Sequence, residues 1–147
     1  MGYLSAFDIS ASALTAQRLR MDIISQNIAN INTTKDKNGL PYRRKTVLFE
    51  ERSSDVPFSE YLSTSSRERL AGNGVRVTKI VEDQSDYKRV YEPGHPDADE
   101  DGYISMPNVD IVTEMVNMIS ASRAYEANVT SINASKSMAM KALEIGR

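Results

Sequence analysis

The sequence predicts a mainly α-helical protein with a small β insert, in which long N- and C-terminal helices pair antiparallel as a coiled-coil-like rod. Two observations predict this fold. Near both ends of the 147-residue chain, apolar residues recur in alternating steps of three and four, and this spacing keeps one stripe facing a partner along a helix. The middle of the chain instead holds short runs of strand-forming residues between turns. We therefore expect an N-terminal helix in 1–34, a β-rich middle segment in 35–106 and a C-terminal helix in 107–147.

The first helix is predicted to begin at Ser5 and to end near Ile31. Ser5 and Asp8 have the spacing of a capping box, with Asp in the place of Glu. The stripe of the repeat consists of Leu4, Phe7, Ala11, Leu14, Arg18, Met21, Ser25 and Ile28.

Polar residues follow the first helix and favour turns over helix. We expect Asn27, Asn30 and Thr33 to direct the chain out of the helix through hydrogen bonds between side chain and backbone.

The second helix is predicted to start after Pro107, with Asn108 as its N-cap. Asp110 then lies near the positive end of the helix dipole. No Gly or Pro interrupts the chain before Ile145, and Gly146 is a natural stop. The stripe of this repeat consists of Ile111, Met115, Met118, Ser122, Tyr125, Val129, Ile132, Lys136, Ala139 and Leu143.

Both helices carry more apolar residues than one stripe facing a single partner helix requires. A helix that is apolar on two faces needs two neighbours, whereas one chain offers each helix one long partner. We therefore expect the remaining faces either to pack against other subunits or to leave a lone subunit with poorly ordered ends. Two interpretations stay open for the polar residues within the stripes: they are simply tolerated, or they set the register between helices. These residues are Arg18, Ser25, Ser122 and Lys136.

The middle segment is expected to form two to four strands. Residues 53–73 are rich in Ser and polar residues, which predicts a mobile stretch, and residues 92–102 form a loop rich in turn residues. The runs of strand-forming residues, the last two being weaker, are Arg43–Arg52, Gly74–Val81, Tyr87–Tyr91 and Tyr103–Met106.

Composition and charge exclude several classes of function. With 18 basic and 20 acidic residues the formal net charge is -2, which gives no general reason to expect nucleic acid or an anionic membrane as a partner. The basic run Arg43–Lys45 is short, and we interpret it as a solvated or subunit-pairing face. The chain has no cysteine, so disulfides, thiolate zinc sites and a cysteine nucleophile are excluded.

The sequence also lacks the marks of an enzyme. His95 is the single histidine and lies in a loop, which favours a packing or surface role over catalysis. No phosphate-binding glycine loop, nucleophile elbow or paired-carboxylate cleft is visible. We therefore expect no catalytic residues, no cofactor, no metal and no small-molecule substrate. No apolar stretch of about eighteen residues exists, and no cleavable signal peptide is visible.

One acidic loop matches the first half of a calcium-binding EF-hand. Asp97, Asp99, Asp101 and Gly102 occupy the first, third, fifth and sixth positions of such a loop. The twelfth position is Asn108, where a bidentate Glu is required. A solvated acidic turn is therefore the favoured interpretation. A calcium-binding protein and a generic coiled-coil adaptor remain the alternative functions.

Several strings, in this order along the chain, resemble bacterial flagellar rod and hook proteins, and the proximal rod proteins in particular. One departure from the pattern is the insert Lys35–Asn38. The resemblance covers nearly the whole chain except residues 53–73. The strings are Ser25–Thr33, Gly39–Phe49, Glu92–Tyr103, Pro107–Asp110, Glu114–Met118, Ala121–Asn128 and Leu143–Gly146.

The resemblance implies a structural subunit of the flagellar basal body that polymerises helically and forms part of the drive shaft and export channel. It implies export through the flagellar type III apparatus without a cleaved signal, and a location in the cell envelope outside the cytoplasmic membrane. The implied partners are FliE-like and FlgB-like proteins on the proximal side and FlgF-like and FlgG-like proteins on the distal side. The expected subunit-interface residues are Leu4, Phe7, Leu14, Met21, Asn27, Ile28, Asn30, Thr33, Met115, Met118, Arg123, Tyr125, Val129, Ile132 and Leu143.

Overall fold

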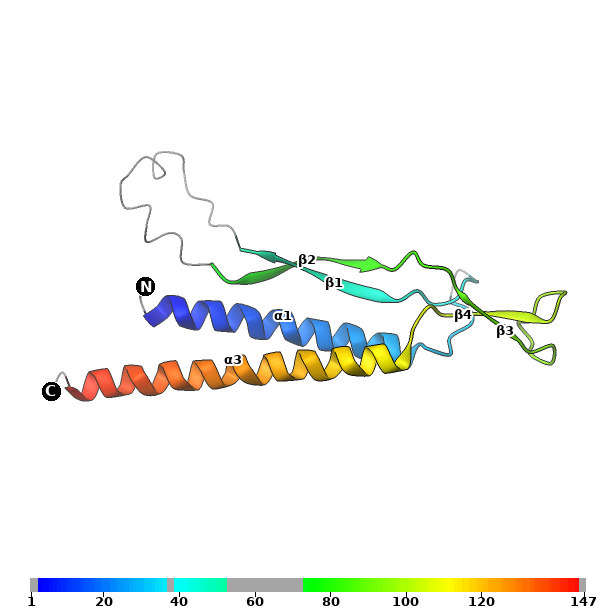
Figure 1. Ribbon diagram of the computed structural model, residues 1–147. Coiled ribbons are helices and arrows are strands. Elements are labelled where there is room, and N and C mark those ends of the chain that lie inside the picture. Colours follow the sequence, from blue (N-terminus) through cyan, green and yellow to red (C-terminus); the bar gives the residue numbers. More distant parts are fainter. Residues whose placement is uncertain (1–2, 37–38, 53–72, 146–147) are drawn as a thin grey trace, which may run out of the picture. The chain divides into compact units, whose positions relative to one another are not determined.

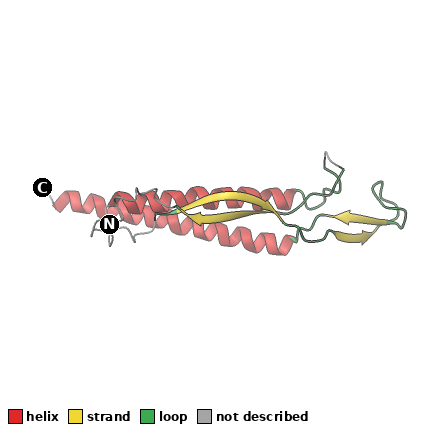
Figure 2. Cartoon of the chain, turned by 90° about the horizontal axis from the view of Figure 1, so that it is seen from above, coloured by secondary structure: helices red, strands yellow, loops and turns green. Residues whose placement is uncertain are grey.

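The computed structural model describes residues 3–36, 39–52 and 73–145 (Figure 1). Along the chain, one long helix precedes and another follows a small β region of two two-stranded sheets, β1–β2 and β3–β4 (Figure 2). This confirms the predicted mainly helical fold with a β insert. The stretch expected to be mobile lies outside the described residues, apart from Asn73. The elements are α1 (Tyr3–Ala29), β1 (Lys45–Glu51), β2 (Val75–Glu82), β3 (Lys88–Tyr91), β4 (Tyr103–Met106) and α3 (Ile111–Ile145).

The chain divides into two compact units, and each contains a part of both helices. The first unit comprises residues 1–18, 49–78 and 122–147, and the second comprises residues 19–48 and 79–121. Within each unit the parts of α1 and α3 lie side by side and run in opposite directions (Figures 1 and 2). Among the described residues, no helix is long and apolar enough to cross a membrane.

In the first unit, α1 packs against the start of β2. The backbone N–H of Val75 donates to Ser12 Oγ over 3.1 Å, and the same hydroxyl donates to the carbonyl of Ile9. Gly74 has a φ of +87°, and a Cβ at this position would collide with the Ser12 hydroxyl. Glycine is therefore required where the β1–β2 hairpin meets the helix. This hairpin therefore gives α1 a further contact within its own chain.

The core of the second unit combines residues from α1, both sheets and α3. Ile23 and Ile24 of α1 and Val47 of β1 are buried, as is Ile104 of β4. β3 and β4 pair antiparallel, with Lys88 opposite Met106 at one end and Tyr91 opposite Tyr103 at the other. All four predicted strands are therefore present, and the two that the sequence marks more weakly pair with each other.

The limits of α1 differ by two residues from the prediction at each end. The helix begins at Tyr3, so Ser5 lies inside it and is not its cap. It ends at Ala29 rather than Ile31, where the Asn30 side-chain amide donates to the carbonyl of Gln26 over 2.8 Å. This bond occupies a carbonyl of the last turn. A capping pattern alone does not determine where a helix begins. Differences of two residues between predicted and observed helix ends are therefore common.

The N-cap of α3 is Asp110 and not the predicted Asn108. Asp110 Oδ2 accepts hydrogen bonds from the backbone N–H of Thr113 over 3.1 Å and from its hydroxyl over 2.6 Å. These bonds hold the pKa of the Asp110 carboxyl below its usual value. Asn108 is used elsewhere: its Oδ1 accepts from the backbone N–H of Arg44. The helix ends at Ile145, as predicted.

Candidate assembly interface

A buried polar network joins α1, β1 and α3 within the second unit. The side chain of Glu114 on α3 is fully buried. Its Oε1 accepts two hydrogen bonds from Arg44, over 2.9 Å from Nε and 2.7 Å from Nη2, and its Oε2 accepts one from Asn27 Nδ2 over 2.8 Å. The buried carboxylate is thus both charge-compensated and hydrogen-bonded, as burial of a charge requires.

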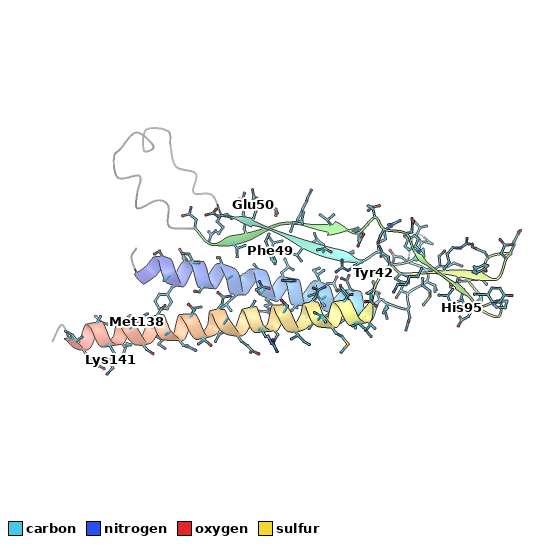
Figure 3. The ribbon with its side chains drawn as sticks, in the orientation of Figure 1. Tyr42, Phe49, Glu50, His95, Met138 and Lys141 are labelled. Carbon is cyan, nitrogen blue, oxygen red and sulfur yellow. The ribbon has the colours of Figure 1, made fainter. Side chains whose placement is uncertain are left out.

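Asn27 links the end of α1 to the start of β1. Its Nδ2 donates to the carbonyl of Lys45 over 2.8 Å, and its Oδ1 accepts from the Lys45 N–H and the Tyr42 hydroxyl, each over 2.9 Å. Figure 3 labels Tyr42 in this region. Burial raises the pKa of the Tyr42 phenol, and the nearby Glu114 charge adds to the effect. The expected side-chain bonds of Asn27 and Asn30 to the backbone are confirmed, whereas the Thr33 hydroxyl donates to the Asn30 side chain over 3.2 Å. Asn27 is fully buried by its own chain.

Arg43 and Arg44 of the basic run are half-buried and bond to other residues of the second unit, so the expectation of a solvated face is wrong for these two side chains. Arg44 pairs with Glu114. The Arg43 guanidinium donates to the carbonyl of Asp83 and lies 4.5 Å from the centre of the Tyr87 ring. Hydrogen bonds from Ser85, followed by the charge of Arg44, hold the pKa of the Asp83 carboxyl below its usual value. Two of the three clustered cations thus have partners within the second unit.

The first turns of α3 bury small and polar side chains and expose large apolar ones. Glu114 and Ala121 are fully buried. On a different side of the helix, five large side chains are between 46% and 65% exposed. At 100° per residue these five form one continuous stripe, whose centre lies about 140° around the helix axis from Glu114 and Ala121. We call this stripe the outer face of α3; it consists of Ile111, Val112, Met115, Val116 and Ile119.

The interface residues expected from the sequence fall into four groups. Asn27 is buried, whereas Met115, Arg123 and Leu143 are exposed, with Leu143 72% exposed. The side chain of Leu4 lies outside what the structure describes. The others are half-buried: Phe7, Leu14, Met21, Ile28, Asn30, Thr33, Met118, Tyr125, Val129 and Ile132.

The stripe predicted for α3 is displaced by about one residue from the most buried stripe of the helix. The most buried positions are Glu114, Ala121 and Ser135, which are separated by multiples of seven. Of the outer face, only Met115 is among the expected interface residues; the members not expected there are Ile111, Val112, Val116 and Ile119. The second apolar face of the helix, which is visible in the sequence, is the pattern that would have predicted these residues.

The acidic loop pairs with residues of its own chain. Thr34 donates to Asp97 over 2.8 Å, and Lys35 forms an ion pair with the same carboxylate. Lys35 and then Thr34 hold the pKa of Asp97 below its usual value. Within the described ranges, no three His, Cys, Asp or Glu residues are placed to hold a metal ion. The calcium-binding alternative therefore finds no support in this loop.

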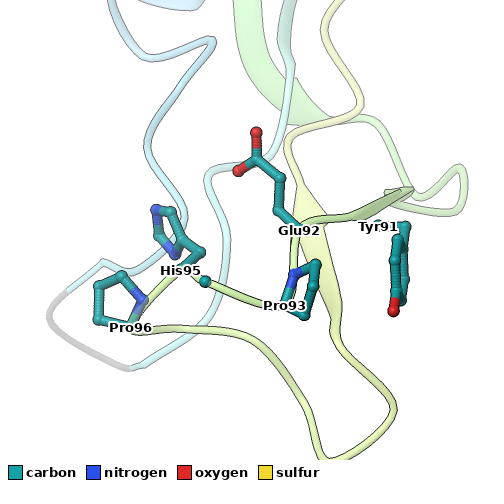
Figure 4. A pocket seen from close by; sticks show the side chains of 6 residues that line it. Tyr91, Glu92, Pro93, His95 and Pro96 are labelled. Atoms are coloured by element: carbon teal, nitrogen blue, oxygen red, sulfur yellow. The ribbon is translucent and has the colours of Figure 1, made fainter.

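A shallow pocket lies beside the acidic loop and is lined by residues from Tyr91 to Pro96 (Figure 4). His95 is half-buried there, and its Nδ1 accepts a hydrogen bond from the backbone N–H of Asp97 over 3.1 Å. Gly102 closes the neighbouring turn with a φ of +78°. His95 thus has the structural role in the loop that the sequence favoured.

Comparison with known proteins identifies the family. The family models "Flagella basal body rod protein" and "Flagellar basal body rod FlgEFG protein C-terminal" match residues 7–35 and 100–145. The flagellar basal-body rod protein FlgC of Bacillus subtilis (strain 168) is 52% identical, with 97% of each chain covered. FlgC of Borreliella burgdorferi is 47% identical over 99% of this chain and 98% of its own. FlgC of Escherichia coli O157:H7 is 44% identical over the full length of both. The chain belongs to the FlgC family of flagellar basal-body rod proteins and is a structural subunit of the rod.

Proposed function

We propose that this chain polymerises helically in the proximal part of the rod and that the outer face of α3 contacts neighbouring subunits. One observation carries the proposal: the five large apolar side chains of this face are exposed together on one stripe. Contiguous apolar surface of this kind marks a site of protein interaction. The chain acts by burying surface between subunits and not as an enzyme.

The energetics of the outer face favour assembly over exposure. Each of its side chains is about half exposed, so burying the remainder would contribute on the order of 1 kcal/mol per residue. Summed over the five residues, this free energy is large enough to change a weak association between subunits into a firm one. A contact between unlike surfaces of successive copies gives an open helical polymer when the rotation does not close a ring. This is the assembly mode we propose.

The finer parts of the proposal rest on the resemblance described above. FliE-like and FlgB-like proteins would neighbour the subunit on the proximal side, and FlgF-like and FlgG-like proteins on the distal side. Export would use the flagellar type III apparatus without a cleaved signal, and the site of assembly would be outside the cytoplasmic membrane. The segments 1–34 and 107–147 would form the core of the rod, around the export channel, with 35–106 as the appended segment.

The proposal is tested by Val116→Asp in cells that lack the chromosomal gene. Val116 is 60% exposed, so the isolated subunit should keep its helix content and thermal stability, whereas a charge buried between subunits without a partner should prevent assembly. We expect loss of hook and filament in electron micrographs and loss of swimming. Met118→Asp should also block incorporation, but Met118 is half-buried in its own chain, so this variant combines folding and assembly effects.

Asn133→Asp is the matched control, because it adds the same charge at an exposed position of the same helix. This variant should restore swimming to the level of the wild-type gene. Normal flagella with Val116→Asp would exclude the outer face of α3 as a subunit contact. Normal flagella in the deletion strain itself would exclude the rod function.

A further inference from the structure

The rotation of the first turns of α3 about the helix axis is not the one expected from hydrophobic burial alone. A helix beside a core is expected to turn its larger apolar stripe inward. In the second unit, Glu114 and Ala121 are instead fully buried, and the outer face of α3, with Val116 among its members, points away. Some interaction must hold the helix in this rotation against the preference for burying larger side chains.

The contacts of Glu114 supply that interaction. Its carboxylate binds Arg44 through one oxygen and Asn27 through the other. Turning α3 by one residue, about 100°, would withdraw the carboxylate from both partners. A charge and its hydrogen-bonding partners would then be buried without compensation, which is among the more costly changes in a protein interior.

We propose that the Glu114–Arg44 ion pair is a register lock: it sets the rotation of α3 so that the outer face is displayed to neighbouring subunits. A buried polar pair often contributes little net stability compared with apolar residues of similar size, and its best-attested use is to select one register. The identification of the neighbours as rod subunits rests on the proposed function. The lock itself is a property of the isolated chain.

Replacing both members of the pair removes the lock without leaving an unpaired buried charge. In Arg44→Leu/Glu114→Leu, Asn27 keeps its hydrogen bonds to both backbone groups of Lys45. The helix is then free to turn its larger apolar stripe inward. The matched control is Lys141→Leu/Glu144→Leu, which removes an ion pair on the same helix whose side chains are 78% and 64% exposed.

The rotation of α3 can be read from the reactivity of single thiols, because the chain contains no cysteine. Val116→Cys and Ala121→Cys are introduced separately, and the rate of maleimide labelling is measured on the purified subunit. With the native pair, the thiol at position 116 should react fast and the thiol at position 121 slowly. With both leucines, labelling at 116 should slow and labelling at 121 should quicken, each by about tenfold or more, since burial protects a group until the structure opens locally.

Two results would overturn the register lock. Unchanged labelling rates in a folded Arg44→Leu/Glu114→Leu protein would show that the pair does not set the rotation. Loss of helix content or a collapse of the melting temperature would show that the pair is needed for stability. The labelling does not require assembly, so it is independent of the proposed function. If labelling changes as expected and the same variant still supports swimming, the lock stands and the outer face is excluded as a subunit contact.

Discussion

The last turns of α1 and the first turns of α3 lie in the same unit, yet they use their apolar residues in opposite ways. In α1, Ile23 and Ile24 are buried. In α3, Glu114 is buried while Val116 is 60% exposed. The difference follows from the number of neighbours that each helix has within the chain. Asn27 connects α1 to both β1 and α3. Among the described residues, no helix or strand covers the outer face of α3. An apolar stripe on a helix therefore predicts that its side chains become buried. It does not predict whether they are buried within the subunit or between subunits of the assembly.

The largest effect is expected from removing only one member of the buried pair. Glu114→Ala leaves the Arg44 guanidinium and the Asn27 amide without their shared acceptor, and breaking a buried pair in this way costs about 3–5 kcal/mol. Urea unfolding of the purified subunit measures this loss. Glu144→Ala, at an exposed ion pair of the same helix, should change stability by less than about 0.5 kcal/mol. Equal effects of the two variants would show that the network contributes nothing specific.

A pair of truncations sharpens the comparison between the two helices. Ile24→Ala should lower the free energy of unfolding of the isolated subunit by about 3 kcal/mol, because it removes a side chain that is only 5% exposed. Val116→Ala should change it by less than about 0.5 kcal/mol but should reduce flagellation. Urea unfolding and counts of flagella per cell provide the two readouts. A large loss of subunit stability with Val116→Ala would contradict the view that α3 displays this face.

The smallest effect is expected from acid acting on the loop of Asp97. The Lys35 ion pair and the Thr34 hydroxyl hold the pKa of this carboxyl below its ordinary value of 3.8. A group with a lowered pKa in the folded state stabilises it above the unfolded pKa, and this stabilisation disappears as the pH falls through the folded pKa. The urea midpoint of the wild type should therefore fall more than that of Asp97→Asn between about pH 5 and about pH 2. Identical pH profiles would show that the Lys35 contact is too weakly formed to matter.

Local sequence signals located most elements of the fold. The strand β4 and the end of α3 at Ile145 agree with the prediction, because alternation, turn residues and a terminal glycine act over a few neighbouring residues. The cap of α3 was misplaced for a related reason. Asn108 and Asp110 are both good capping residues, and the choice between them depends on Arg44, whose backbone N–H occupies the Asn108 side chain.

By itself, the sequence determined that this protein has two long terminal helices, a small β insert and more apolar helix surface than one chain can bury. Only the tertiary structure decided which faces are buried. The periodicity of a helix places its residues around the axis, but the neighbour on each side comes from distant parts of the chain. Asn27 and Glu114 meet across 87 positions of sequence. Their hydrogen bonds and the charge of Arg44 keep a polar residue inside, and so leave the larger apolar residues of α3 on the surface.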